Sequence, residues 1–274
     1  DRMTAAVLYG KEDLKIEQVP VPKIKPDEVL VRVRTALTCG TDLKVYRQGY
    51  HARMIVPPAI FGHELAGEIV EMGSEVQGFR LGQRVVAANS APCGECRYCR
   101  RDRANLCDNL LFNNGAYAEY IKIPGPIVRQ NMLEIPEGIS FTDAALVEPL
   151  ACVLRGFDAV HVRPDDSVLV IGMGPIGLMF VRMARLRGAH VIAVGKRDSQ
   201  LAAAKRMGAD EVVNAGKGGD LVDEIRSKTP DHMGVDIAIE AVGTPATWEL
   251  AFQTMRRGGT VNCFGGCQIG RAHV

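Results

Sequence analysis

Residues 167–177 read SVLVIGMGPIG, a largely apolar run followed by three glycines in the spacing G-x-G-x-x-G. The run at residues 167–171 is typical of a buried parallel strand, and residues 175–187 are predicted to form a helix. Gly172 would allow a tight turn, Gly174 would let a pyrophosphate approach the backbone, and Gly177 would let helix and strand pack closely. The helix N-terminus would then face the negative phosphates. A glycine-rich turn without a ligand is the alternative.

Strands and helices alternate on the C-terminal side of this motif. Further strands are expected at residues 190–194, 212–213, 235–239 and 260–264, and helices at residues 198–207, 221–227 and 247–255. A strand–helix–strand series builds a parallel sheet with helices on both faces, the doubly wound α/β arrangement of the Rossmann fold. We count five strands where the common dinucleotide-binding fold has six, so the sheet is expected to lack its last strand.

The residues after the second strand of this series select the cofactor. An Asp or Glu there would hydrogen-bond the ribose 2′-hydroxyl of NAD, but this chain has Gly195 followed by Lys196 and Arg197. Two cations favour the 2′-phosphate of NADP through charge-assisted hydrogen bonds. The acidic candidate, Asp198, is expected to cap the next helix instead; a solvated turn at residues 196–197 is the other alternative. The predicted cofactor-binding residues are Gly172, Gly174, Pro175, Ile176, Gly177, Gly195, Lys196, Arg197, Val242 and Gly243.

The N-terminal half has the pattern of a β domain. Residues 29–34, 68–73 and 84–87 are expected to be strands, separated by glycine and proline turns. Short strands at this spacing indicate a small barrel or sandwich. The pattern changes near residue 140, where residues 140–143 resemble a helix cap and residues 144–154 are predicted to be helical apart from Pro149. We therefore expect two domains, residues 1–150 and residues 151–268.

Four cysteines are closely spaced in the first domain: Cys93, Cys96, Cys99 and Cys107. The spacing Cys-x2-Cys-x2-Cys-x7-Cys lets one short loop surround a single tetrahedral ion with four thiolates, as in a structural zinc site. A two-residue gap is too tight for a relaxed disulfide. A ferredoxin-type iron–sulfur cluster is the stronger rival, but its motif continues with x3-Cys-Pro. Here the fourth cysteine follows after seven residues and precedes Asp108.

Composition and charge argue against several classes of protein. The 274 residues are 47% hydrophobic and 24% charged, with a formal net charge of +1, which is ordinary for a globular protein. This balance gives no electrostatic footprint for nucleic acid or an anionic membrane, and it argues against a non-enzymatic zinc-binding or nucleic-acid-binding module. No stretch reaches the roughly 20 apolar residues of a membrane helix. Four of the eight cysteines have a metal-binding spacing, so we expect an enzyme of the reducing cytoplasm.

Both ends of the chain carry sequence that we interpret as non-native. Residues 269–274 read IGRAHV, which a common sequencing adapter would encode in one frame, and Asp1 and Arg2 precede Met3. We therefore expect a chain truncated after the fifth strand, with a non-native tail at residues 269–274; a natural short tail is the alternative. The strand at residues 260–264 would then be an uncovered edge, which predicts poor solubility and little turnover.

Five motifs together resemble the zinc-dependent medium-chain dehydrogenase/reductase family, and the resemblance extends to about Cys267. In chain order they are Cys39-Gly40-Thr41-Asp42, Gly62-His63-Glu64, the four-cysteine loop, Glu148-Pro149-Leu150 and the glycine motif. The first and fourth look most like the polyol (sorbitol/iditol) and threonine dehydrogenase branch. The resemblance implies a GroES-like β-barrel catalytic domain at residues 1–150, a Rossmann domain at residues 151–268, and hydride transfer between an alcohol and NAD(P).

The resemblance also implies a catalytic site. The implied ligands of a catalytic zinc are Cys39, His63 and Glu148, three protein groups that leave one position open for substrate. Glu64 would be an alternative fourth ligand or a partner of the ligands, and Thr41 would pass the substrate's proton outward. The family often has a histidine five residues after the ligand cysteine, but this chain has Lys44 there. The outer part of the proton relay is therefore open.

These features predict a zinc-dependent oxidoreductase that transfers a hydride between a secondary alcohol or polyol and NAD(P), with NADP favoured and two zinc ions per chain. The catalytic zinc would polarise the substrate oxygen, and the cofactor would carry the hydride. An L-threonine 3-dehydrogenase-like enzyme and an inactive truncated fragment are the alternatives. The resemblance implies a homo-oligomer, a dimer or a tetramer, for the full-length form; no nucleic-acid or membrane partner is expected.

Overall fold

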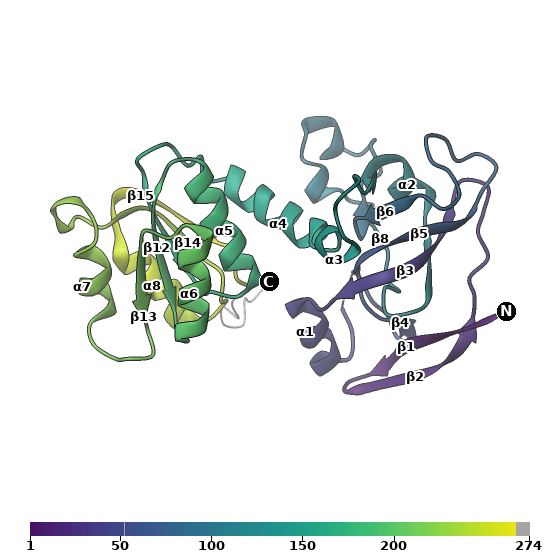
Figure 1. The fold of residues 1–274 in the computed structure, drawn as a ribbon, viewed down its shortest axis with the longest axis horizontal. Helices are drawn as coiled ribbons and strands as arrows, with labels where there is room; N and C mark the ends of the chain where they lie inside the picture. Colours follow the sequence, from purple (N-terminus) through teal and green to yellow (C-terminus); the bar gives the residue numbers. More distant parts are fainter. Residues whose placement is uncertain (52, 267–274) are drawn as a thin grey trace. The chain divides into compact units, whose positions relative to one another are not determined.

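The computed structural model describes residues 1–51 and 53–266, which Figure 1 shows coloured along the sequence. The chain forms two compact units, unit 1 (Asp1–Glu148) and unit 2 (Pro149–Val274). The division falls inside helix α4 (Val147–Asp158), close to the boundary expected at residue 150. The tail expected at residues 269–274 and Cys267 lie outside the described residues.

Unit 1 contains two antiparallel sheets in its described part, with the strand orders β2-β1-β4 and β10-β6-β5-β3-β9, and a separate pair β7-β8. Short α-helices α1 (Gly40–Gln48), α2 (Gly125–Asn131) and α3 (Phe141–Ala144), and 3-10 helices η1 (Cys99–Arg101) and η2 (Ala104–Leu106), join them. The strands are β1 (Arg2–Gly10), β2 (Asp13–Pro20), β3 (Val29–Leu37), β4 (Ala59–Ile60), β5 (Glu64–Met72), β6 (Arg84–Ala87), β7 (Ser90–Ala91), β8 (Leu111–Phe112), β9 (Tyr120–Ile123) and β10 (Met132–Glu134).

The core of unit 1 follows from the alternation of its strands. Val29 and Val31 of β3 pack with Leu65 and Ile69 of β5 in one buried cluster, as expected where every second side chain points to the same face. Both strands are longer than predicted: β3 continues to Leu37, and β5 begins at Glu64 rather than residue 68. These extensions bring the chain directly to residues 39 and 63–64, so the ends of two paired strands carry the candidate metal ligands.

Unit 2 is a parallel sheet covered by helices on both faces (Figure 1). Within residues 149–266 the strand order is β13-β12-β11-β14-β15. The strands are β11 (Ser167–Ile171), β12 (His190–Gly195), β13 (Glu211–Asn214), β14 (Val235–Glu240) and β15 (Met255–Cys263). The helices besides α4 are α5 (Pro175–Leu186), α6 (Asp198–Met207), α7 (Leu221–Arg226), α8 (Pro245–Thr254) and the 3-10 helix η3 (Pro230–His232). The alternation expected from the sequence is present, with β11 and α6 at their predicted bounds.

The two faces of this sheet are separated residue by residue along β11. Val168 and Val170 pack against side chains of α4, α5 and α6, such as Phe180. Leu169 and Ile171 pack on the opposite side, in the cluster that includes α7 and α8. Because both faces are buried, the strand reads as a continuous apolar run instead of an alternating one.

The start of α4 agrees with the sequence in part. Ser140 caps α3, its side chain accepting the N–H of Asp143. Pro149 was expected to interrupt a helix over residues 144–154, but it lies in the first turn of α4, where its missing N–H has no intrahelical partner to lose. The helix therefore continues through Pro149.

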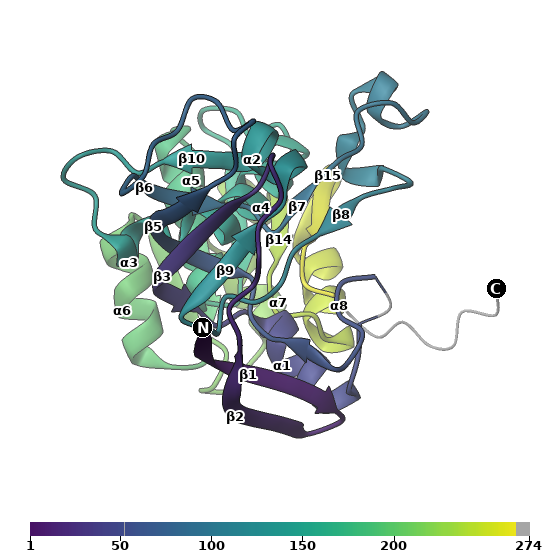
Figure 2. The ribbon, with the colours of Figure 1, turned by 90° about the vertical axis from the view of Figure 1, so that its right-hand side faces the viewer.

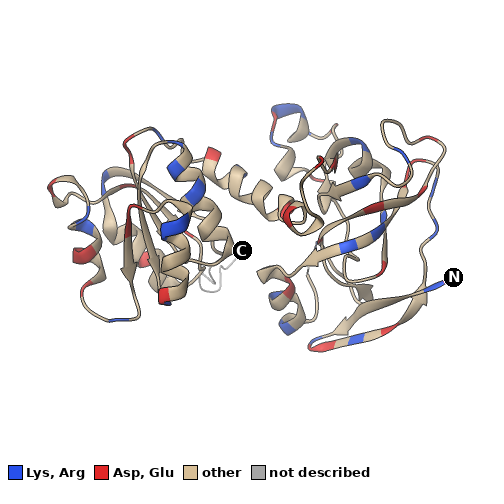
Figure 3. Ribbon diagram, in the orientation of Figure 1, with Lys and Arg blue, Asp and Glu red and all other residues tan. Residues whose placement is uncertain are grey.

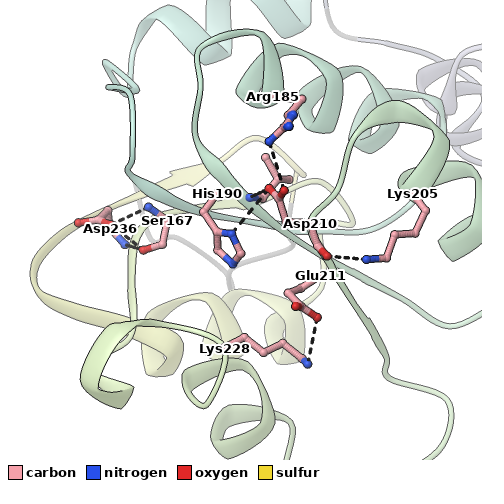
Figure 4. A network of polar contacts seen from close by, with 9 residues as sticks. Ser167, Arg185, His190, Lys205, Asp210, Glu211, Lys228 and Asp236 are labelled. Carbon is pink, nitrogen blue, oxygen red and sulfur yellow. Dashed lines mark hydrogen bonds and ion pairs between the residues drawn. The ribbon is translucent and has the colours of Figure 1, made fainter.

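A polar network lies at the amino ends of the parallel strands in unit 2 (Figure 4). Asp210, just before β13, lies 3.2 Å from Nη1 of Arg185 and 3.7 Å from Nδ1 of His190. Beside it, Ser167 donates its backbone N–H and its hydroxyl to Oδ2 of Asp236. These contacts connect the first residues of neighbouring strands, at the end of the sheet opposite the glycine motif.

The distribution of charged residues and the hydropathy of the helices match what the composition predicts. In Figure 3, lysine and arginine residues are interspersed with aspartate and glutamate residues along the ribbon of both units. Among the described residues, no helix is both long enough and apolar enough to cross a lipid bilayer.

Candidate functional site: two donor clusters and a nucleotide cavity

Cys39, His63 and Glu64 form a compact donor group in unit 1. One ligand atom from each lies within 4.8 Å of the other two, and the side chains of His63 and Glu64 are buried. Cys39 is the N-cap of α1, and its sulfur accepts the backbone N–H of Thr41 at 3.4 Å. His63 and Glu64 stand at the start of β5, whose pairing with β3 brings them beside Cys39. Thiolate, imidazole and carboxylate are all donors that zinc accepts.

Asp42 organises this group, although sequence reasoning gave it no role. Its Oδ1 lies 3.1 Å from Nδ1 of His63, an ion-pair distance without full hydrogen-bond geometry. Its Oδ2 accepts the backbone N–H of Cys39 at 2.9 Å. With Nδ1 directed at a carboxylate, Nε2 is the ring nitrogen available to a metal, as is usual for histidine ligands. The capping-box pattern at residues 39–42 was the signal that could have revealed this residue.

The electrostatics of the group fit a bound cation. Burial alone would lower the pKa of His63, but the contacts with Asp42 and Cys39 outweigh it and raise that pKa to about 10. For the carboxyl groups of Glu64 and Glu148, burial has the opposite effect and raises the pKa. Several acidic groups are thus crowded around one imidazole, and their ionised forms require a neighbouring positive charge. A divalent ion would supply that charge, so the residues present fit the expected zinc.

Glu148, Thr41 and Lys44, which the sequence analysis connected with catalysis, lie outside this donor group and differ in their exposure to solvent. Glu148 is close enough for its carboxyl to feel the charge of His63, but it is outside the three-residue donor group, so its role as a ligand stays a prediction. Thr41 is partly buried in the first turn of α1, and Lys44 is exposed on the same helix.

The four cysteines of the loop form a second donor group. They lie in the segment between β7 and β8, which projects from the sheets of unit 1 in Figure 2. The Sγ atoms are 3.5 Å apart in the pairs Cys96–Cys99 and Cys93–Cys107, and 3.9 Å apart in the pair Cys96–Cys107. Four sulfurs about 2.3 Å from one tetrahedral zinc would be about 3.8 Å apart. The spacing fits a closed zinc site and excludes disulfides, whose sulfurs are about 2 Å apart.

Backbone groups prepare this loop for a cation. The N–H groups of Cys99 and Asp108 lower the pKa of the Cys96 thiol to about 6. Desolvation and the neighbouring thiol of Cys96 raise the pKa of Cys99 to about 12. Four crowded thiols therefore do not ionise together by themselves, whereas a metal ion would stabilise all four thiolates.

A cavity of about 810 Å³ lies in unit 2, at the carboxyl ends of the parallel strands. Gly172, Gly174, Ala241 and Val242 are among the residues that line it. These loops follow the adjacent strands β11 and β14, on either side of the point where the strand order reverses. In open parallel sheets this is the place where nucleotides bind.

Glycine is needed at the three positions of the motif for different physical reasons. Gly172 has φ +101°, and a Cβ there would lie 2.6 Å from Cγ2 of Val242. A Cβ at Gly177 would lie 1.7 Å from the carbonyl oxygen of Gly172, so both positions need glycine for the protein itself. A Cβ at Gly174 would meet open space. This open position at the uncapped N-terminus of α5 leaves room for a phosphate, so the site fits a dinucleotide.

The other predicted cofactor residues divide into two sets. Gly195, Lys196, Arg197 and Val242 line the cavity. Pro175, Ile176 and Gly177, in the first turn of α5, and Gly243 are not among its lining residues. Gly243 donates its N–H to the buried carboxylate of Glu240, which also accepts the N–H of Val242 at 2.7 Å. An acidic residue at the end of an apolar strand was the signal that could have revealed Glu240.

Two expectations about single residues are wrong. Asp198 does not cap α6: Arg197 is the N-cap, and Asp198 is the first helical residue, whose carboxylate accepts Nδ2 of Asn214 instead. From its place in the strand expected at residues 260–264, Cys263 would be a small core residue, but it is exposed. It is the last residue of β15, an outer strand among the described residues.

Comparisons with known proteins agree with this arrangement. Two family models match the chain, the alcohol dehydrogenase GroES-like domain at residues 25–136 and zinc-binding dehydrogenase at residues 175–272. Sorbitol dehydrogenase of Bacillus subtilis is 38% identical over 271 residues, covering 96% of this chain and 75% of that protein. An L-threonine 3-dehydrogenase of a Chelativorans species is 36% identical over 274 residues, covering 96% of this chain and 77% of that protein.

Solved structures are similar along the whole described chain. A Sinorhizobium meliloti protein assigned as a zinc-binding dehydrogenase, bound to NADP, has a TM-score of 0.90 and 32% identity, covering 100% of this chain and 80% of its own. Galactitol-1-phosphate dehydrogenase of Escherichia coli has a TM-score of 0.87 and 27% identity, covering 98% of this chain and 77% of its own. These matches confirm the expected fold, a GroES-like domain followed by a doubly wound parallel sheet. The chain belongs to the zinc-dependent medium-chain dehydrogenase/reductase family, as an alcohol or polyol dehydrogenase that uses zinc and NAD(P).

Proposed function

We propose that this chain oxidises a secondary alcohol or polyol at the Cys39–His63–Glu64 group, with NADP in preference to NAD. The observation that carries the proposal is the clustering of these three donors within 4.8 Å, beside a buried Asp42. Three donors leave one position of a tetrahedral ion open, unlike the closed four-cysteine group. When bound there, zinc would polarise the substrate oxygen and make the alcohol easier to ionise.

The residues of the chain supply binding, orientation and a path for the proton. Asp42 holds the imidazole of His63 in one orientation. We assign to the Thr41 hydroxyl the removal of the alcohol proton, because Thr41 lies in the same helix turn that carries Cys39. In unit 2, Gly172 and Gly174 would cradle the pyrophosphate, and the N-terminus of α5 would favour its negative charge.

The preference for NADP rests on the lining of the cavity. Lys196, Arg197 and Gln200 line it, while Asp198 faces Asn214 in a separate depression. The end of β12 thus offers the adenosine ribose two cations and no carboxylate of its own. Arginine and lysine both bind phosphate groups strongly, whereas a carboxylate at this position would repel the 2′-phosphate. The NADP bound to the Sinorhizobium meliloti relative supports the same preference.

Replacing one metal ligand tests the reaction. His63→Ala should abolish alcohol oxidation, while binding of NADPH, followed by its fluorescence, stays close to that of the unchanged chain. The control is His232→Ala, an exposed residue of unit 2 outside both donor groups. Undiminished oxidation by His63→Ala would overturn the proposal, and lost cofactor binding would mean that His63 serves the cofactor.

The second candidate is L-threonine 3-dehydrogenase activity. It is favoured by relatives with that activity at 36% identity, close to the 38% of sorbitol dehydrogenase. A panel of sorbitol, 2,3-butanediol and L-threonine separates the two, because only an amino-acid substrate needs a site for its ammonium and carboxylate.

The expected dimer or tetramer and the cytoplasmic location stay predictions. Light scattering tests the oligomeric state.

A further inference from the structure

Tyr117 contacts the segments that carry two of the candidate metal ligands. It lies between β8 and β9, partly buried. Its hydroxyl oxygen is 2.7 Å from Oδ2 of Asp42 and 2.8 Å from the carbonyl oxygen of Leu37. Leu37 is the end of β3 and Asp42 is in the first turn of α1, so these two contacts bracket the ligand Cys39.

The Tyr117 hydroxyl donates its hydrogen bond mainly to the carboxylate of Asp42. A phenol has a single O–H to donate, and both of its neighbours here are acceptors. A carboxylate accepts a hydrogen bond more strongly than a neutral carbonyl does. Asp42 Oδ2 therefore receives the Tyr117 hydroxyl together with the Cys39 N–H, while Oδ1 faces His63. The carboxylate is fixed on both oxygens, and its direction toward the imidazole is fixed with it.

The ring and backbone of Tyr117 hold the segment that carries the other two ligands. A Cβ at Gly62 would lie 2.6 Å from a ring carbon of Tyr117, so the ring packs directly on the residue before His63. The N–H of Tyr117 donates to the carbonyl of Phe61 at 2.9 Å, and that of Ala116 donates to the carbonyl of Gly62 at 3.1 Å. One residue therefore touches both ligand-bearing segments, by its hydroxyl on one side and by its ring and backbone on the other.

We propose that Tyr117 is a positioning residue for the metal ligands, whose hydroxyl locks the Asp42 carboxylate and so presets His63 and Cys39 for one ion. The inference rests on the proposed function, because it assumes that Cys39, His63 and Glu64 hold a catalytic metal. It assigns to the hydroxyl an effect on metal binding that is separate from the packing of the ring on Gly62 and Phe61. The ring and the hydroxyl can be separated by the substitution Tyr117→Phe.

Release of zinc to a chromogenic chelator measures this effect without any substrate. The release phase that is missing in His63→Ala belongs to the catalytic ion, and the phase missing in Cys96→Ser belongs to the four-cysteine loop. Tyr117→Phe should release the catalytic ion about tenfold faster, at the low end of the about 10–100-fold losses typical of residues that orient metal ligands. The loop phase should not change. With cobalt in place of zinc, the visible absorption bands of the catalytic site should shift.

A matched tyrosine and a double variant complete the test. Tyr120→Phe removes a hydroxyl of the same unit that accepts Nη2 of Arg32 at 3.2 Å, and it should leave both release phases unchanged. Because Tyr117 acts through Asp42, adding Tyr117→Phe to Asp42→Asn should change release less than about twofold, far from additivity. A thermal melt checks that each variant folds.

The outcomes separate this inference from the proposed function. If the unchanged chain shows no release phase that depends on His63, there is no catalytic ion, and both fail. If that phase exists but Tyr117→Phe leaves it and the cobalt spectrum unaltered, only the role of Tyr117 is overturned. Equal effects of Tyr117→Phe with and without Asp42 would likewise contradict action through that carboxylate.

Discussion

The carboxylate of Asp198 accepts a hydrogen bond of 2.6 Å from Nδ2 of Asn214, and this contact holds it away from the cofactor cavity. Asn214 ends β13, and its Oδ1 accepts the N–H of Gly216 at 2.8 Å. Asp198, the acidic residue that directly follows Lys196 and Arg197 in the chain, is thus part of a small structural network, and these two cations line the cavity without it.

Removing these two cations should therefore weaken the preference for NADP. In Lys196→Ser/Arg197→Ser, the ratio of kcat/KM for NADP to that for NAD should fall by roughly ten- to a hundredfold for each charge-assisted bond lost, about 1.5–3 kcal/mol. Lys217→Ser, which changes a lysine outside the cavity, is the control. A natural preference for NAD would show that residues 196–197 form only a solvated turn.

Adding Gly195→Asp to that double variant should reverse the preference. The new carboxylate could accept the ribose 2′-hydroxyl of NAD and would repel the 2′-phosphate of NADP. A Cβ at Gly195 would lie 3.1 Å from Cγ of Met173 and 3.2 Å from Cδ2 of Leu201. Both side chains are buried and would have to shift by a few tenths of an ångström, so we expect a modest loss of thermal stability with the switch. Steady-state kinetics with both cofactors decide; unchanged discrimination would contradict the role of Gly195.

The buried Glu64 and the partly buried Glu148, both near His63, should differ in their effect on metal binding. Glu64 belongs to the donor group and Glu148 does not, so Glu64→Gln should weaken binding of the catalytic ion more than Glu148→Gln. In Glu64→Gln, the affinity for the ion should fall at least as much as when a residue that only orients a ligand is replaced, which typically costs about 10–100-fold. Competition with a chelator measures both variants in the absence of substrate. The opposite ranking would make Glu148 the ligand, as the family resemblance implies.

Loss of one loop cysteine should remove about one zinc per chain and lower the melting temperature. Cys96→Ser breaks a group of four sulfurs within 4.8 Å of one another, and a structural zinc contributes its binding free energy to folding. Cys152→Ser, a cysteine of α4 outside both donor groups, is the control. Elemental analysis that finds iron and inorganic sulfide in this loop would establish the iron–sulfur alternative.

Much of the fold could be predicted because its signals are local. Residues 167–171 are apolar because both faces of β11 are buried, and the glycines after them are set by contacts a few residues away, such as Gly177 on Gly172. The candidate ligands Cys39 and His63 were predicted from short motifs, and the fold brings them together. Each of these patterns lies within about ten residues, so it remains legible in the sequence.

The parts that were missed depend on contacts between distant residues. Asp42 and Tyr117 are 75 positions apart, and nothing in either local sequence announces the other. Asp198 looks like a helix cap until the fold brings Asn214 to it from the next strand. The exposure of Cys263 depends on which strand is outermost, a property of the whole sheet.

Asp236 should make unit 2 sensitive to acid. Burial alone would raise the pKa of Asp236, but the hydrogen bonds from Ser167 and the charge of Arg256, whose Nε lies 2.6 Å from Oδ1, outweigh it and lower that pKa. These contacts join the starts of β11, β14 and β15 (Figure 4 shows Ser167 and Asp236). A carboxyl with a lowered pKa in the folded state stabilises the protein fully above its unfolded pKa, about 3.9. That contribution is lost as the pH falls from there through the folded pKa.

The urea midpoint of the unchanged chain should therefore decline steeply below about pH 4. Asp236→Asn should lower the midpoint at pH 7, because the charge on Arg256 loses its partner, and should flatten the decline below pH 4, because the titrating group is gone. Asp231→Asn, a change at an exposed carboxylate in η3, should leave the pH profile as it is. If Asp236→Asn and the unchanged chain lose stability in parallel below pH 4, the acid sensitivity arises elsewhere.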